Sequence, residues 1–311
     1  MRDILYIVVP CYNEEAVIDE TTKRLTEKLK NLIITERISE KSRILYVNDG
    51  SKDNTLEILK QYEKDQKIKL IVGKNVGVVR SFYECLEKAY SNGDYFAYCD
   101  QDDFWHANKI TRAVNMLKNE KNDKPLLYFS EFNYCDEQLN FLNKSKLNRK
   151  GADFKNSLVE CIAFGISEVF NKQLAKKILD SGTENVCFHD WWAYMIASGM
   201  GKVIYDNEAT VEYRRTGANV SPSGKSAIGL QIYRIKKFVF GKYFCNIRRQ
   251  IEKYKELFKN DINKESQQIL NMFSVNYNLI KSIKKTFYPK MFRQKNSDEI
   301  MCRMLFLLGR L

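Results

Sequence analysis

The first third of the chain alternates between short apolar runs and longer segments with helical spacing. The apolar runs lie at residues 4–9, 44–47, 68–72 and 95–99, and apolar residues three or four apart follow each of them. Four strand–helix units in succession predict a parallel sheet with right-handed crossovers and helices on both faces. We therefore expect an α/β fold in which a mainly parallel sheet is flanked by helices.

Polar motifs follow each of the four runs. Along the chain they read VPCYNE at 9–14, NDGS at 48–51, KNVG at 74–77 and DQDD at 100–103. The carboxyl ends of parallel strands meet at one edge of a sheet, and open α/β sheets bind their ligands there. The four motifs are therefore expected to share one rim, which becomes the candidate binding site.

The DQDD motif brings three carboxylates together just beyond an apolar run. Such acids repel one another unless a cation lies among them, and hard cations prefer oxygen ligands. We predict that Asp102 binds a divalent cation, Mn²⁺ or Mg²⁺, and that Asp100 contacts ribose or reaches the ion through water. The alternative is a solvated acidic turn in which Asp103 caps the following helix.

Composition excludes several other classes of protein. The eight cysteines lie singly, without a C-x-x-C pair, which favours reduced thiols in a cytoplasmic protein over zinc or disulfides. Two histidines are too few for a multi-histidine metal site. No run reaches the roughly eighteen apolar residues of a membrane span, and the N-terminus is too soon acidic for a secretion signal.

Basic charge is concentrated near the C-terminus. Residues 225–311 hold 19 Lys/Arg against 6 Asp/Glu, a net charge of +13, whereas residues 1–224 hold 32 against 33. Helical faces are expected around Ile232, Ile235, Phe238 and Val239 and again over residues 269–288, with lysines between the apolar positions. Basic amphipathic helices of this kind lie on anionic membrane surfaces. The alternative is that they pack back on the body.

The four motifs, in this order and at strand ends, resemble the nucleotide-sugar half of family 2 glycosyltransferases, which have the GT-A fold. The start is also similar to bactoprenol- and dolichol-phosphate sugar transferases. From Gly77 onward, NVGVVRSF, CDQDDFWHANKI, FHDWW and FYPKMFRQKNSDEIMCRMLFLLGR resemble bacterial rhamnosyltransferases of cell-wall and capsule assembly. The resemblance implies a GT-A catalytic domain at 1–222, with a nucleotide-sugar half at 1–106 and an acceptor half at 107–222. A basic helical region would follow at 223–311.

The resemblance also implies roles at the donor end. Asp49 would accept the N3–H of uracil or thymine, and Pro10 and Tyr12 would form a wall against the base. A plain turn residue is the alternative for Asp49, and a first-turn helix charge is the alternative for Glu14. The residues expected to bind the nucleotide-sugar are Pro10, Tyr12, Glu14, Asp49, Asp100 and Gln101.

The FHDWW motif at 188–192 is the candidate acceptor end. By resemblance, Asp190 at a helix start is the general base of an inverting transferase. Sugar rings stack on indoles, so Trp191 and Trp192 are predicted to bind the acceptor, and His189 to position it. The alternative is a helix-capping Asp beside two core tryptophans.

The chain departs from the family pattern at three places. Asn48 stands where Asp is frequent, Arg80 lies two positions earlier than expected, and Thr216 stands where rhamnosyltransferases have a histidine. If that histidine helps to hold the metal or the diphosphate, this chain works without it.

These observations predict an inverting glycosyltransferase that uses a nucleotide-diphosphate sugar, with rhamnose from dTDP-rhamnose as one candidate. The acceptor would be a glycan, lipid-linked, at the inner face of the cell membrane, where the basic region would hold the protein peripherally. A transferase that uses UDP-glucose or UDP-galactose, or acts directly on polyprenyl phosphate, is the same-fold alternative. Nucleic-acid binding is disfavoured, because no RNP, zinc-finger or helix-turn-helix signature accompanies the basic charge. The oligomeric state is not predicted.

Overall fold

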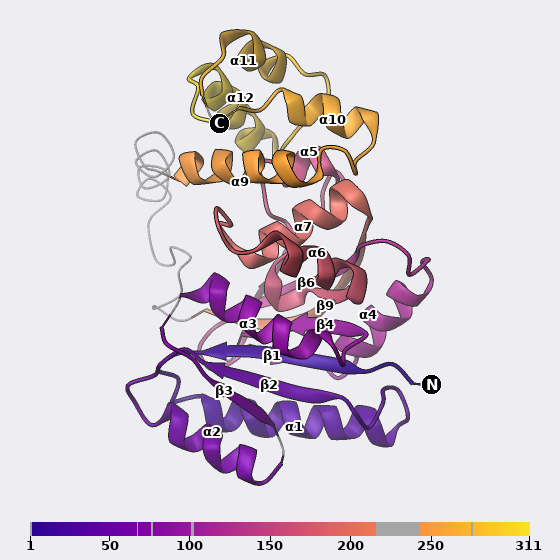
Figure 1. Cartoon of the computed structure of the whole chain (residues 1–311), viewed down its shortest axis with the longest axis vertical. Coiled ribbons are helices and arrows are strands. Elements are labelled where there is room, and N and C mark those ends of the chain that lie inside the picture. The colour runs from indigo at the N-terminus through magenta and orange to yellow at the C-terminus, as the bar shows by residue number, and fades with distance from the viewer. Residues whose placement is uncertain (1, 67, 76, 101–102, 216–242, 275) are drawn as a thin grey trace.

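The computed structural model describes residues 2–66, 68–75, 77–100, 103–215, 243–274 and 276–311 (Figure 1). Within them the strands form a mixed sheet in the order β3-β2-β1-β4-β8-β6-β9-β5, and β7 pairs with β6. The first four strands run parallel to one another, with β1 paired to both β2 and β4. The predicted α/β fold with a mainly parallel sheet is confirmed at this end of the molecule.

The four predicted strand–helix units are present, with bounds close to those expected from the apolar runs. The strands are β1 (Leu5–Cys11), β2 (Arg43–Asn48), β3 (Lys69–Val72) and β4 (Tyr95–Tyr98). The helices that connect them are α1 (Ile18–Ile34), α2 (Thr55–Lys64) and α3 (Val78–Tyr90).

The first strand extends past the apolar run at 4–9 and includes Pro10. Pro10 lies within β1, opposite Val47 of β2. The pairing of β1 with β4 stops at Val8, so β1 is paired on one side only at Pro10. A proline, which lacks an N–H donor, is tolerated where a strand has an open side.

The second half of the sheet is mixed. β8 lies antiparallel between β4 and β6, and β6 is parallel to β9. The strands here are β5 (Phe104–Trp105), β6 (Leu126–Cys135), β7 (Phe141–Lys144), β8 (Val169–Asn171) and β9 (Lys202–Arg214). The helices are α4 (Lys109–Lys118), α5 (Phe154–Ser157), the 3₁₀ turn η1 (Gly165–Ser167), α6 (Lys172–Ser181) and α7 (His189–Met200).

The sheet separates two hydrophobic cores, and β1 shows how the sequence fills both. Successive side chains of a strand point to opposite faces. Accordingly Leu5, Ile7 and Val9 join the core under α1, α2 and α4, whereas Tyr6 and Val8 join the core under α3, α6 and α7. The continuous apolar run therefore reflects a strand that is buried on both sides.

The C-terminal helices are α9 (Tyr243–Phe258), α10 (Lys264–Asn271), α11 (Leu279–Thr286) and α12 (Asn296–Leu307). The helical stretch expected over 269–288 is therefore interrupted. It breaks before Asn278, whose side chain accepts a hydrogen bond from the N–H of Lys281 and starts a new helix there. The helical face expected around Ile232 lies outside the described residues.

The C-terminal helices share a core with the rest of the chain. The Tyr254 ring of α9 lies 6.0 Å from Trp192 of α7 and 5.2 Å from Phe154 of α5, measured between centroids. Residues on both sides of the boundary proposed at 222/223 therefore build one hydrophobic cluster. Among the described helices, none is both long and apolar enough to cross a bilayer.

Candidate active site

The loops after β1 and β2 are fastened to each other at the predicted rim. Asn13, in the left-handed region with φ 57°, donates its N–H to Ser51 Oγ at 2.9 Å and accepts from the Lys52 N–H at 2.8 Å. Glu14 N–H donates to Thr55 Oγ1 at 2.7 Å. These bonds hold the VPCYNE loop against the NDGS loop. Asn13 thus joins the two loops and does not cap α1, which begins only at Ile18.

Asp49 connects the NDGS loop to the KNVG loop. Its side chain is buried, and its Oδ2 accepts a hydrogen bond from the Gly77 N–H at 3.1 Å. Gly77 has φ 87°, which side-chain-bearing residues rarely adopt, and α3 begins at the next residue. Asn48 accepts from Ser51 N–H and Oγ through its Oδ1, so an amide serves this turn where the family pattern has an acid.

Two more predicted donor residues lie on this rim. Tyr12 is 37% exposed, directly after the buried end of β1, and Pro10 and Glu14 beside it are partly buried. Burial raises the pKa of the Cys11 thiol to about 12, and the negative charges of Glu14, Asp53 and Asp49 raise it further. The rim therefore carries a ring that a planar base can reach, in a field of negative charge.

The DQDD loop leaves β4 at the same edge of the sheet. Asp100 is partly buried there, whereas Gln101 and Asp102 lie outside the described residues, so the predicted metal ligand Asp102 remains a prediction. Asp103 accepts a hydrogen bond from the Arg214 N–H at 3.2 Å through its Oδ1. Asp103 does not cap the next helix, because α4 begins at Lys109, after Asn108.

The downstream end of the DQDD loop is anchored to β9. β5 pairs antiparallel with β9, and the His106 Nε2 lies 2.5 Å from Glu212 Oε1. Glu212 also accepts from Asn133 Nδ2 and Cys135 Sγ. The sequence around His106 gives no sign of this contact, because its partner lies over a hundred residues further along the chain.

A buried lysine, Lys109, lies near Asp100 and Asp103 of the DQDD motif. Lys109 is fully buried, donates from Nζ to the Ile166 carbonyl at 2.8 Å and lies 3.4 Å from the Trp105 ring centroid. Burial lowers its pKa to about 7, against the opposing effects of neighbouring acidic groups that include Asp103 and Asp100. The DQDD loop thus meets a site where negative charge is concentrated.

The donor set fits a hard divalent cation in chemical type. Carboxylate oxygens are the ligands that Mg²⁺ and Mn²⁺ prefer. The described residues contain no cluster of three or more His, Cys, Asp or Glu side chains that would bind a metal by themselves. A cation at this rim would therefore be held by Asp100 together with Asp102 and the diphosphate of the donor.

Asp190 lies in the first turn of α7, as predicted. Its Oδ1 accepts from the Trp191 N–H at 2.7 Å, and its Oδ2 accepts from the Gly165 N–H at 3.2 Å. A Cβ added at Gly165 would lie 3.0 Å from His189 Nε2 and 3.4 Å from Asp190 Cβ. The lack of a side chain at Gly165 therefore allows η1 to come close to the start of α7.

His189 joins the start of α7 to the strand that leads into the DQDD loop. Its ring stacks on Phe82 of α3 at 3.6 Å and meets Tyr98, the last residue of β4, edge-on at 4.6 Å between centroids. Burial lowers the pKa of His189 to about 4, so the imidazole is neutral at physiological pH. The structure thus brings the predicted base, ninety residues away in sequence, next to the end of β4.

The predicted role of the two tryptophans as a sugar-binding surface is corrected by the structure. Trp191 and Trp192 are 3% and 0% exposed. The Trp191 Nε1 donates to the Ser157 carbonyl at 2.6 Å, and the Trp192 Nε1 donates to Ser181 Oγ at 2.8 Å. Both indoles lie in the core with their polar atoms satisfied, so an acceptor sugar cannot stack on them.

Glu168 is a residue that the sequence analysis missed. It is fully buried, and neither carboxylate oxygen has a hydrogen-bond partner among the described residues. Burial raises its pKa well above the ordinary value, the charge of Asp190 raises it further, and Lys109 opposes the shift. The sequence contains a signal for this residue, since Glu168 is the one charged residue in the mostly apolar segment 162–170.

A cavity of about 770 Å³ lies between α1 and the β5–α4 segment. Its lining includes Asp103, Trp105 and Arg214 but neither Asp49 nor Asp190. The cavity therefore does not coincide with the rim on which the motifs meet, and the motif rim remains the candidate active site.

The fold is that of the GT-A glycosyltransferases, and solved structures agree on it. S. aureus TarS 1–349 in complex with UDP-GlcNAc superposes with a TM-score of 0.51, at 14% identity, over 86% of this chain and 78% of that one. The mannosyltransferase PcManGT from Pyrobaculum calidifontis in complex with GDP-Man and Mn²⁺ gives 0.55, also at 14%, over 100% of this chain and 73% of that one.

The chain belongs to the family described as glycosyl transferase family 2, which it matches over residues 6–179. It is 40% identical over 103 residues to the uncharacterized glycosyltransferase YkoT of Bacillus subtilis, a match that spans 32% of this chain and 31% of that one. It is 25% identical over 317 residues to the dTDP-rhamnosyl transferase RfbG of Shigella flexneri, which covers 96% of this chain and 98% of that one.

Proposed function

We propose that this glycosyltransferase transfers rhamnose from dTDP-rhamnose, with inversion, to a lipid-linked glycan during surface-polysaccharide synthesis. The observation that carries the choice of donor is the similarity to a dTDP-rhamnosyl transferase over nearly the full length of both chains. Family membership supplies the reaction class, and the donor, acceptor and stereochemistry are the proposal.

Donor recognition is assigned to the three loops that hydrogen bonds hold together. The Asp49 carboxylate, which accepts from the Gly77 N–H, would also accept the N3–H of thymine or uracil. Tyr12 is exposed enough for a base to stack on it, and Pro10 lies at the base of the same loop. Glu14, Asp100 and Gln101 would contact the ribose and the rest of the donor.

Asp100 and Asp102 would hold a divalent cation, Mn²⁺ or Mg²⁺. When bound, the cation would neutralise the negative charge of the diphosphate leaving group. The family histidine is replaced by Thr216, which lies outside the described residues. This chain must therefore supply any third ligand from other groups or from the donor itself.

Asp190 is assigned the role of general base. The acceptor hydroxyl oxygen would form a bond to the anomeric carbon as the bond from that carbon to the diphosphate oxygen breaks. The hydroxyl proton would pass to the Asp190 carboxylate, a transfer worth about 10²–10⁴ in rate. The supporting observation is that His189 packs on Tyr98, which places Asp190 beside the strand that carries the DQDD loop.

A donor panel tests the proposal. Thermal unfolding would be measured with dTDP-rhamnose, UDP-glucose, UDP-galactose, UDP-GlcNAc and GDP-mannose, each with Mn²⁺ and with EDTA. A donor at a hundred times its Kd stabilises the folded state by about 2.7 kcal/mol. We expect this gain for dTDP-rhamnose with Mn²⁺, together with rhamnose transfer to a lipid-linked glycan.

The same panel separates the alternatives. Stabilisation by UDP-glucose or UDP-galactose, without an effect of dTDP-rhamnose, would reject the rhamnosyl donor and leave the family assignment intact. Transfer to polyprenyl phosphate itself would reject the glycan acceptor. An equal response in EDTA would reject the cation at Asp100 and Asp102.

A further inference from the structure

Helix α11 exposes large apolar side chains and buries polar ones on its opposite face. Ile280, Ile283 and Phe287 are 66%, 44% and 75% exposed, at positions that share one face of the helix. Ser282 and Thr286 on the opposite face are 2% and 8% exposed. A helix that served only to fill the hydrophobic core would instead bury its apolar face and expose its polar face.

Helix α12 presents a second apolar stripe beside it. The stripe consists of Ile300, Met304, Leu307 and Leu308, which are 65%, 58%, 47% and 61% exposed. Unlike α11, α12 also has an apolar buried face, which contributes Cys302, Leu305 and Phe306 to the core. The outward stripe is therefore additional to what packing requires, and grouped exposed apolar residues mark interaction surfaces.

The two helices are bonded to each other. Arg303 Nη1 donates to the Thr286 carbonyl and Lys285 Nζ donates to the Leu311 carbonyl, each at 2.5 Å. They form the end of the molecule opposite α1 and α2 (Figure 1). We call the two stripes together the α11–α12 face, made up of Ile280, Ile283, Phe287, Ile300, Met304, Leu307 and Leu308.

The charges around this face are positive. Residues 276–311 hold eight Lys/Arg and two Asp/Glu. Glu299 is buried against Arg303, and Asp298 lies 4.0 Å from Arg293, so both acids have arginine neighbours. Exposed basic residues that include Lys284, Lys295 and Arg310 remain on the surface.

This combination fits an anionic lipid surface better than a second copy of the chain. A two-fold contact through the face would bring the same excess of positive charge together from both sides, and like charges across an interface are costly. Anionic lipids instead attract each lysine or arginine near the surface, while the large apolar side chains insert between headgroups.

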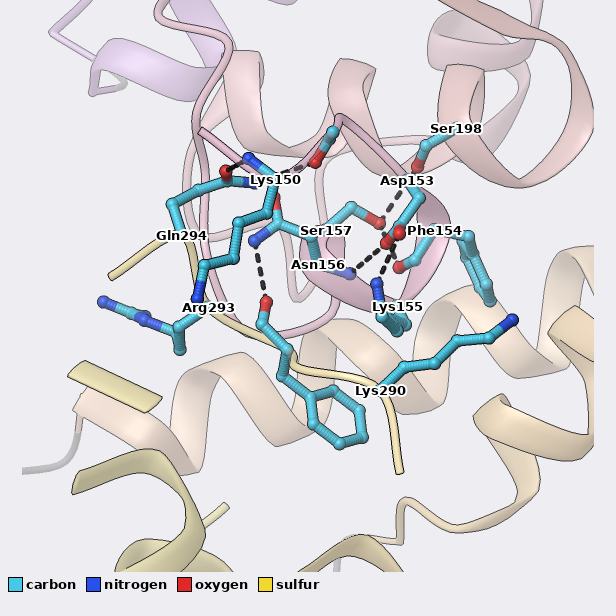
Figure 2. A network of polar contacts seen from close by, with 12 residues as sticks. Lys150, Asp153, Phe154, Lys155, Asn156, Ser157, Ser198, Lys290, Arg293 and Gln294 are labelled. Atoms are coloured by element: carbon cyan, nitrogen blue, oxygen red, sulfur yellow. Dashed lines mark hydrogen bonds and ion pairs between the residues drawn. The ribbon is translucent and has the colours of Figure 1, made fainter. Parts of the chain in front are cut away.

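The face is fixed to the catalytic half through a buried polar junction (Figure 2). Gln294 is 4% exposed and accepts, through Oε1, from the N–H groups of Arg149 at 2.8 Å and Lys150 at 2.7 Å. Asn156 donates to the Phe292 carbonyl at 2.7 Å and accepts from the Tyr194 hydroxyl at 2.9 Å. Tyr194 belongs to α7, the helix that carries Asp190.

We propose that the α11–α12 face docks on an anionic bilayer and that the Gln294–Asn156 junction sets the orientation of the catalytic rim above it. The inference rests on exposure, charge and packing, and it does not depend on which donor is used. A lipid-linked acceptor would then approach a site that is held at a fixed angle to the membrane.

Co-sedimentation of the full-length protein with vesicles tests the proposal. Vesicles of phosphatidylcholine would be compared with vesicles that also contain phosphatidylglycerol, at low and high salt. Binding to the anionic vesicles is expected, and it should weaken as salt rises. Ile283→Ser with Phe287→Ser should weaken partitioning about tenfold or more, from lost apolar burial. Lys281→Gln with Lys284→Gln should also weaken it about tenfold or more, since each charge contributes about fivefold.

The matched control is Ile34→Ser, at a 65% exposed apolar residue at the end of α1, on the opposite side of the molecule. It should bind vesicles as the wild type does, and all variants should unfold at similar temperatures. Unchanged binding in both double variants would overturn the proposal. A concentration-dependent dimer that Phe287→Ser converts to monomer would overturn it in favour of a second copy.

Discussion

The motifs at the strand ends and the motif at the start of α7 are built differently. Tyr12 and Asp49 lie in loops at the sheet edge, and hydrogen bonds to backbone groups hold these loops together. The FHDWW motif is instead part of an aromatic core that continues into α9. The strand-end motifs therefore leave side chains at the edge of the sheet, whereas the motif at the helix start also contains core residues.

The largest expected effect is a loss of kcat on substitution of Asp190, which adjoins that core. Asp190→Asn keeps the size of the side chain and one of its two hydrogen bonds from backbone N–H groups, because the amide has a single acceptor oxygen, and it removes the basicity. We expect kcat to fall by about 10²–10⁴ with little change in donor affinity. Steady-state kinetics and donor titration measure the two quantities.

Asp180→Asn is the control for this substitution, since Asp180 is an exposed acid on α6 that pairs with Lys176. Its kcat should equal that of the wild type. Wild-type kcat in Asp190→Asn, or retained anomeric configuration in the product by NMR, would reject the assignment of the base. Loss of donor binding in Asp190→Asn would indicate a structural role instead.

The second effect compares one aromatic residue from each half. Trp192→Ala removes a fully buried indole and should lower the free energy of unfolding by about 3–5 kcal/mol. Tyr12→Ala removes a ring that is 37% exposed and should change stability by no more than about 0.5 kcal/mol while weakening donor binding. Denaturant unfolding and donor titration on both variants measure this contrast. Equal loss of stability in the two would contradict it.

The third effect concerns recognition of the base. In Asp49→Asn the amide oxygen still accepts from the Gly77 N–H, but the second carboxylate oxygen is replaced by a donor. Donor affinity should fall by roughly 1.5–3 kcal/mol, or about tenfold to a hundredfold, with kcat at saturation nearly unchanged. Isothermal titration with the nucleoside diphosphate measures the affinity. Undiminished affinity would mean that Asp49 is a plain turn residue.

The smallest effect is on stability and depends on pH. The folded-state pKa of Glu168 is raised, so the folded protein holds this proton more tightly than the unfolded chain does. Stability is therefore lost as pH rises from the ordinary glutamate range towards the raised pKa. Glu168→Gln cannot titrate, so it should match the wild type near pH 4 and exceed it by on the order of 1 kcal/mol at pH 8.

Thermal unfolding across this pH range measures the difference. Lys109 and Asp190 are the charged groups that act on Glu168, and they act in opposite directions. A variant that is less stable than the wild type at pH 8 would mean that the ionised carboxylate is paired with Lys109, contrary to this prediction.

The shared core also determines how the basic C-terminal region can be tested. Removing residues after 223 would strip Tyr254 and Phe258 from Trp192 and expose the aromatic core. Loss of membrane binding in such a truncation would not be distinguishable from loss of the fold. Point substitutions on the α11–α12 face leave that core intact, and they are the cleaner measurement.

The sequence by itself determined the α/β order, the four strands of the donor half and the rim on which their motifs meet. It could do so because strand burial and helical spacing are local periodicities, and parallel strands must end at one edge. It also placed Asp190 at a helix start, and the structure has it in the first turn of α7.

Only the tertiary structure decided which residues around Asp190 are buried in the core. Trp191 and Trp192 became core residues because Ser157, Ser181 and α9 close over them, and Ser157 and α9 are distant in sequence. Glu168, Lys109 and Glu212 acquired their surroundings in the same way, from strands and turns brought together by folding. Periodicity also predicts which residues share a face, as on α11, but the direction of that face follows from long-range packing alone.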